Sequence, residues 1–150
     1  MLPLLRPARA EDIPAIAGLL AALFAIEADF HADSSRQQRA LHSMLGREDI
    51  LLQVAELDGA VVGFCSVQTL ISTAEGGPAG LVEDVVVAAP HRGQGIARAL
   101  LTAASIWAAL RGISRLQLLA DRDNHPALAF YRHLGWQETR LGCWRMLVTR

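Results

Sequence analysis

The stretch that decides the fold is residues 81–101, which read LVEDVVVAAPHRGQGIARALL. Leu81 to Val87 is the most β-prone run in the chain, and it predicts a strand. Glycines at 93 and 95 follow, and an apolar helical pattern then continues to about Arg111. A glycine-bearing turn into a helix offers unpaired N–H groups to an anion. On this local pattern alone, a tight connection that needs glycine only for its dihedral angles is an equally good interpretation.

Glu83 and Asp84 stand inside this apolar strand, where two carboxylates are costly unless they are paired or used. Side chains alternate across a strand, so the two carboxylates are expected on opposite faces unless a bulge intervenes. Glu83 then shares a face with Val85 and Val87.

The rest of the chain predicts strands and helices around this unit. Asp58-Gly59 is a strong two-residue hairpin signal. The cluster at residues 75–80 is expected to end the hairpin and begin a new element, because it cannot continue a strand ladder. The predicted helices cover residues 10–26, residues 34–46 with Ser34 and Ser35 as caps, a long stretch after the glycine-bearing turn to about Arg111, and residues 124–134. The remaining predicted strands cover residues 2–5, 50–56, 60–71, 116–120, 136–141 and 144–148. This order predicts a mixed sheet with helices on both faces.

Length and composition exclude several classes of protein. The 150 residues predict a single domain, and 14 Lys and Arg against 15 Asp and Glu argue against nucleic-acid or anionic-membrane partners. Cys65 and Cys143 show no paired spacing, so reduced thiols in the cytoplasm are expected. The histidines show no spacing typical of a metal site. The apolar run at 15–26 is too short to span a bilayer, and the acidic pair at 11–12 before it argues against a signal peptide.

Two segments together resemble a known family. Arg92-Gly93-Gln94-Gly95-Ile96-Ala97 looks like the acyl-CoA-binding motif Arg/Gln-x-x-Gly-x-Gly/Ala of the GNAT superfamily of N-acetyltransferases. Asn124-x-x-Ala127-x-x-Phe130-Tyr131-x-x-x-Gly135-Trp136 looks like its second signature, and the element order matches over essentially the whole chain. The resemblance implies an α/β (α+β) fold with a mixed, largely antiparallel central sheet that splays at the acyl-CoA site.

The resemblance also implies where acetyl-CoA binds. Its pyrophosphate would lie on the N–H groups of the turn, and its pantetheine would run beside the preceding strand like an added strand. That strand would separate from its neighbour at 116–120. The implied contact residues are Val85, Val86, Val87, Arg92, Gly93, Gln94, Gly95, Ile96, Ala97, Arg98, Asn124 and Ala127. For Asn124, helix capping is the safer role.

For catalysis, the resemblance makes Tyr131 the general acid near the CoA sulfur. The alternative for this tyrosine, the only one in the chain, is an aromatic packed on a short amphipathic helix. Glu83 resembles in position a strand glutamate that some relatives use as a base, and Asp84 stays open as the alternative.

The implied activity is direct transfer of acetyl from acetyl-CoA to a primary amine, with a small-molecule acceptor favoured. Two alternatives stay open: a protein or peptide N-acetyltransferase and a non-catalytic acyl-CoA-binding module. The resemblance to this family is also compatible with a homodimer. In this family the acceptor pocket is shaped by the first helix pair and the last strands, which points to Phe24, Glu27, Phe30, His31, Asp33 and Trp144.

Overall fold

In the computed structural model of the protein, residues 2–26 and 33–149 are described. The chain forms two compact units, residues 1–118 and 119–150. The first unit contains β1 (Leu4–Pro7), a 3-10 turn (Ala10–Asp12), α1 (Ile13–Ile26), α2 (Ser34–Met44), β2 (Ile50–Leu57), β3 (Ala60–Ser72), β4 (Gly77–Val87), a second 3-10 turn (Ala89–His91), α3 (Ile96–Leu110) and β5 (Leu116–Gln117). The second unit contains α4 (His125–His133).

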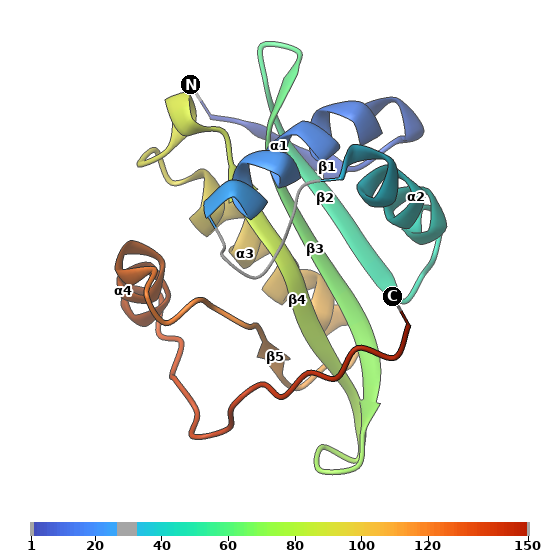
Figure 1. The fold of residues 1–150 in the computed structure, drawn as a ribbon, viewed down its shortest axis with the longest axis vertical. Coiled ribbons are helices and arrows are strands. Elements are labelled where there is room, and N and C mark those ends of the chain that lie inside the picture. Colours follow the sequence, from blue (N-terminus) through green and yellow to red (C-terminus); the bar gives the residue numbers. More distant parts are fainter. Residues whose placement is uncertain (1, 27–32, 150) are drawn as a thin grey trace. The chain divides into compact units, whose positions relative to one another are not determined.

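The five strands form one sheet in the order β1-β2-β3-β4-β5. The first four are antiparallel to their neighbours, and β5 runs parallel to β4. Helices α1 and α2 lie on one face of this sheet and α3 lies on the other (Figure 1). The mixed, largely antiparallel sheet with helices on both faces is therefore confirmed.

Each face of the sheet buries its own apolar side chains. Ile16 of α1, Val54 of β2 and Phe64 of β3 are completely buried in the core under α1 and α2. On the opposite face, a Cβ on Gly63 would lie 3.1 Å from the Ile96 side chain of α3. The absence of a side chain at Gly63 thus lets α3 approach the centre of the sheet.

The hairpin between β2 and β3 forms where the sequence places it. Asp58 has φ of 50° and Gly59 has φ of 79°, as a two-residue turn of this hand requires.

Within the described ranges, no helix has both the length and the apolar character that crossing a membrane requires.

Three element predictions are wrong. The segment at 77–80 continues β4, where Pro78 pairs with Ile71, because β5 pairs with β4 only from Gly80 and leaves one side of Pro78 without a strand. Helix α2 is capped by Asp33, whose side chain accepts a hydrogen bond from the Arg36 N–H, and not by the serines after it.

The third is the closing pair of strands at 136–141 and 144–148. No strand is assigned among the described residues after β5. From Leu141 onward, the large apolar side chains of this segment are exposed, Trp144 at 96% of its surface. A strand needs a hydrogen-bonding neighbour and burial of one face, and alternating residue types supply neither.

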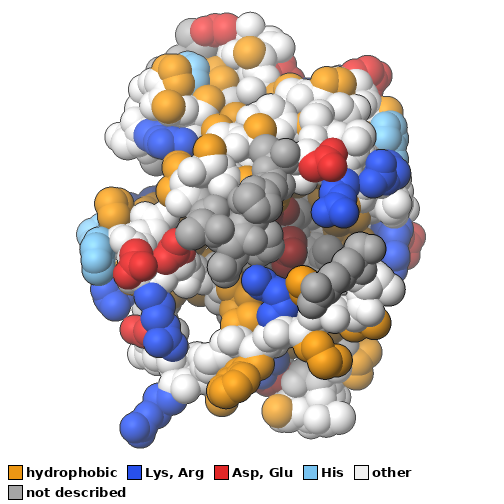
Figure 2. Space-filling model, in the orientation of Figure 1, with side chains coloured by type: hydrophobic (Ala, Val, Ile, Leu, Met, Phe, Trp, Pro, Cys, Tyr) orange, Lys and Arg blue, Asp and Glu red, His pale blue; other side chains and the backbone are white. Residues whose placement is uncertain are grey.

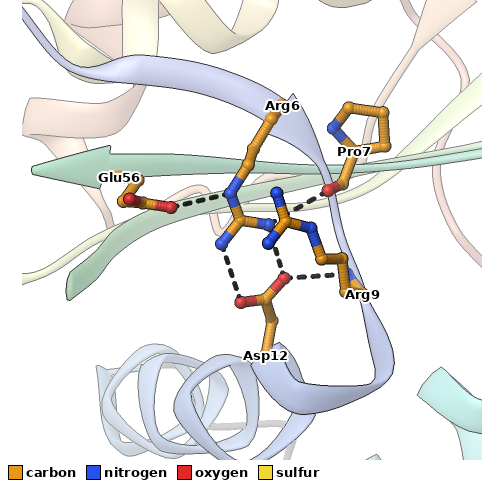
Figure 3. A network of polar contacts seen from close by, with 5 residues as sticks. All are labelled: Arg6, Pro7, Arg9, Asp12 and Glu56. Carbon is orange, nitrogen blue, oxygen red and sulfur yellow. Dashed lines mark hydrogen bonds and ion pairs between the residues drawn. The ribbon is translucent and has the colours of Figure 1, made fainter. Parts of the chain in front are cut away.

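A cluster of charged groups ties the start of the chain to the sheet (Figure 3). Arg6 of β1 donates to both carboxylate oxygens of Asp12, at 2.7 and 2.9 Å, and to Glu56 of β2 at 2.7 Å. Asp12 also accepts from the Arg9 N–H at 2.8 Å. The hydrogen bonds from Arg6 are the main reason that the pKa of Asp12 is lowered. Because both side chains are nearly buried, this pair sets the position at which α1 starts.

Arg6→Ala is expected to lower the free energy of unfolding by about 2–4 kcal/mol, because it leaves two carboxylates with fewer partners near the core. A carboxylate with a lowered folded-state pKa stabilises the fold above its unfolded pKa of about 4, and that contribution disappears as the pH falls further. The difference from wild type in urea unfolding should therefore shrink at acid pH.

Arg47→Ala is the matched control. Arg47 makes a similar double contact with Asp49, but both side chains are about half exposed. Because solvent screens an exposed pair, its loss should cost little stability. Equal losses in the two variants would show that the Arg6 cluster does not anchor α1.

Candidate functional site

The turn between β4 and α3 lies open on the surface. Gly93 and Gly95 have φ of 74° and 82°, which L side chains adopt only with strain. Residues 92–95 are all exposed, and Ile96, the first residue of α3, is buried and holds the helix start against the sheet. The turn is therefore a fixed loop whose backbone faces solvent.

The backbone donors of this turn are unpaired. The N–H of Ala99 donates to the Gly95 carbonyl at 3.0 Å, and it is the first amide of α3 with an acceptor. Within the described part of the chain, the six N–H groups of residues 93–98 have no hydrogen-bond partner. Six unpaired donors at the positive end of a 15-residue helix form a site suited to a diphosphate.

Arg92 adds a full positive charge beside these amides. Its Nε donates to the Val87 carbonyl at 3.0 Å, which holds the guanidinium between the end of β4 and the turn. Its two terminal nitrogens have no partner among the described residues, so they can donate to phosphate oxygens.

A shallow groove of about 430 Å³ begins beside this turn and follows α3. It is lined by Leu5, Gly95, Arg98, Ala99, Thr102, Ala103 and Ile106.

Figure 2 shows one face of the molecule, on which acidic and basic side chains are interspersed.

Within the described residues of the first unit, the edge of β4 that faces away from β3 is open near the turn, since no strand pairs with it there. Strands β4 and β5 pair only at Gly80–Leu116 and Leu81–Gln117, so the predicted separation of the two strands is confirmed. The N–H of Ala88 donates to the Val62 carbonyl, and hydrogen-bonded positions alternate along an antiparallel pair. Val85 and Val87 therefore direct their backbone groups to the open edge.

Val86 differs from its two neighbours. Its backbone groups face β3 and its side chain is buried in the core with Phe64. Of the three predicted contact residues in this strand, the geometry brings Val85 and Val87 to the open edge, and Val87 already accepts from Arg92 with its carbonyl.

A β-bulge lies at the two carboxylates of β4. Ser66 of β3 pairs with Asp84 and Val67 pairs with Val82, which leaves Glu83 as the extra residue. Asp84 shares a face with Val86, which packs in the core under α1. On the other side of the bulge, Leu81 pairs with Gln68, whose side chain contacts Met44 of α2.

Leu81 and Asp84 face α1 and α2, and between them Glu83 has no ladder partner that would fix its face. Glu83 is exposed and Asp84 is half-buried. The bulge that would bring the two carboxylates to one face is therefore present.

Two neighbours of Asp84 on β3 are buried. The Ser66 hydroxyl, completely buried, donates to Asp84 Oδ2 at 3.1 Å. Burial and, to a lesser degree, the charge of Asp84 raise the pKa of the Cys65 thiol to about 12. A thiol with this pKa is protonated at neutral pH and is a poor nucleophile, so Cys65 is structural.

In the second unit, α4 carries the second signature. Asn124 accepts from the Ala127 N–H at 3.3 Å, which makes it the N-cap of α4 as expected. Tyr131 is half-buried between two rings, with centroids 5.3 Å from Phe130 and 5.7 Å from Trp136. The signature therefore gives the ring of Tyr131 two aromatic contacts.

Six residues are expected around the acceptor amine. Three of them, Glu27, Phe30 and His31, lie outside the described residues. Phe24 is half-buried near the end of α1, Asp33 caps α2, and Trp144 is exposed in the second unit. Among residues 2–26 and 33–149, no group of three or more His, Cys, Asp or Glu side chains is arranged to hold a metal ion.

The open amides, the adjacent arginine and the open strand edge define a domain suited to a phosphate-bearing ligand with an extended chain. The sequence model of the acetyltransferase (GNAT) family matches residues 19–136, which is most of the chain. The protein therefore belongs to the acetyltransferase (GNAT) family, as the two motifs predicted.

Individual relatives support the assignment of the chain to this family. The chain is 47% identical to mouse N-alpha-acetyltransferase 80 over 57 residues, which are 38% of this chain and 17% of that protein. It is 42% identical to streptothricin acetyltransferase of Streptomyces lavendulae over 55 residues, 37% of this chain and 29% of that protein. The matches thus span less than a third of these two relatives.

A solved structure shares the fold. The crystal structure of a possible acetyltransferase from Clostridium difficile 630 superposes with a TM-score of 0.86 over the whole of both chains at 20% identity.

Proposed function

We propose that this protein transfers acetyl from acetyl-CoA to a primary amine of a small molecule, in a ternary complex and without an acyl-enzyme. The observation that carries the proposal is the row of unpaired amides at residues 93–98 beside Arg92 and the open edge of β4. The name of the Streptomyces lavendulae relative supports a small-molecule acceptor.

The residues present fit acetyl-CoA. The amides and Arg92 would hold its diphosphate, and the backbone groups of Val85 and Val87 would pair with its pantetheine amides. When bound, acetyl-CoA supplies a thioester carbonyl open to attack. A main-chain N–H at the open edge of β4 would polarise that carbonyl.

Glu83 and Tyr131 take the two proton-transfer roles in this proposal. Glu83 accepts the proton that the amine loses as its nitrogen bonds to the acetyl carbon. Tyr131 donates its phenol proton to the sulfur as the carbon–sulfur bond breaks, and solvent restores that proton. Tyr131 enters by the resemblance, and Glu83 by the resemblance together with its exposed place on the bulge.

A second candidate is acetylation of a peptide or protein N-terminus, which the name of the mouse relative supports. A panel of amines and free-N-terminus peptides, assayed by thiol release from acetyl-CoA and by product mass, separates the candidates. We expect a small amine to be acetylated most efficiently. Turnover of peptides alone would favour the second candidate, and CoA binding without turnover would favour a non-catalytic module.

Arg92→Ala should weaken CoA binding by about 1.5–3 kcal/mol, the value of a hydrogen bond to a charged group. Isothermal titration with CoA measures this loss. Arg111→Ala is the control, because Arg111 follows the other end of α3 and stacks on Trp107. Unchanged affinity in Arg92→Ala, or an equal loss in the control, would contradict a phosphate role for Arg92.

A further inference from the structure

The hydroxyl of Ser66 is a polar group in an apolar part of β3. Its neighbours Phe64, Cys65 and Val67 are, like Ser66 itself, completely buried. A buried hydroxyl is costly unless it makes a hydrogen bond, and this one donates to Asp84 Oδ2 on β4. Ser66 therefore fixes the orientation of a carboxylate across two strands.

The position of this hydrogen bond in the sheet is informative. The register of β3 and β4 changes between Ser66 and Val67, so Ser66 is the residue opposite the bulge. The extra residue of a bulge has no ladder partner, and a change of register by one residue would turn it to the other face. A side-chain hydrogen bond at this point opposes such a change.

We propose that Ser66 is a positioning residue. It holds Asp84, and the held Asp84 keeps the bulge, and with it Glu83, in one register. This inference rests on the proposed function, in which Glu83 is the base. It assigns Ser66 no contact with substrate.

The expected kinetic effect follows from the role of geometry in proton transfer. A displacement of about 1 Å can cost about 100-fold in rate. Loss of one bracing hydrogen bond should move Glu83 by less, so Ser66→Ala is expected to lower kcat about tenfold. The KM for acetyl-CoA should stay unchanged, because the turn at 92–98 is not altered.

The test compares four single variants and one double variant, assayed with the best amine of the panel. Ser72→Ala is the matched control, because Ser72 is also buried on β3 but its hydroxyl accepts from the Glu75 N–H at the hairpin turn. Ser66→Thr keeps the hydroxyl and should recover most of the rate. Ser66→Ala added to Glu83→Gln should lower kcat no further than Glu83→Gln alone, because Ser66 acts through Glu83.

Any of three kinetic results would overturn the inference. These are a wild-type kcat in Ser66→Ala, an equal loss of kcat in Ser72→Ala, and the same tenfold loss when Ser66→Ala is added to Glu83→Gln. If Ser66→Ala does not fold, Ser66→Cys keeps the side-chain shape with a weaker donor and should lose at least about threefold in kcat; a wild-type rate there overturns the inference. A wild-type protein that acetylates no amine would instead overturn the proposed function, and this inference with it.

Discussion

Tyr131→Phe is expected to lower kcat by about 100-fold or more, because general acid catalysis typically contributes 10² to 10⁴ in rate. The substitution removes one oxygen and keeps the ring contacts with Phe130 and Trp136. The affinity for CoA should therefore stay near that of wild type. Steady-state kinetics with the best acceptor and titration with CoA measure the two quantities.

Trp136→Phe is the control for packing around Tyr131. It changes a ring that contacts Tyr131 and leaves the phenol in place. If Tyr131→Phe keeps the wild-type kcat, or if Trp136→Phe loses as much, the aromatic is a packing residue, which was the alternative from the sequence.

Glu83→Gln is expected to lower kcat by about 100-fold, again the scale of a general acid or base. A base must be deprotonated to act, so the wild-type rate should rise with pH as the base ionises. In Glu83→Gln this rise should be lost. The pH profile of kcat/KM between acid and alkaline pH is the measurement.

Asp84→Asn is the natural comparison. Asparagine keeps an oxygen that can accept from the Ser66 hydroxyl, so the bulge should keep its register. A smaller loss than in Glu83→Gln, with the alkaline rise intact, is expected. If the rise disappears only in Asp84→Asn, the base is Asp84.

Local features of the fold could be predicted from the sequence because their causes are local. Asp58-Gly59 can adopt the positive φ angles of a two-residue hairpin, and Gly95 can begin a helix from the left-handed region. Asn124 caps the helix that the sequence predicts to begin there. Each of these depends on one or two residues and their immediate neighbours.

Features that depend on pairing between distant residues were beyond a sequence pattern. The bulge at Glu83 depends on the register with Ser66, and the serine carries no signal because its partner Asp84 is 18 positions away. Trp144 to Val148 has the composition of a strand, but composition supplies no neighbour to pair with. The ion pair between Arg6 and Asp12 likewise forms only in the folded chain, and no sequence pattern links the two charges.

The most direct test of the account follows the backbone amides of the turn by NMR as CoA is added. We expect the largest shifts at Gly93, Gly95 and Ile96, with Gly76 in the turn between β3 and β4, at the other end of the sheet, unchanged as an internal reference. Saturable CoA binding, verified by calorimetry, that leaves the amides of residues 93–98 unshifted would contradict the claim that this turn holds the diphosphate.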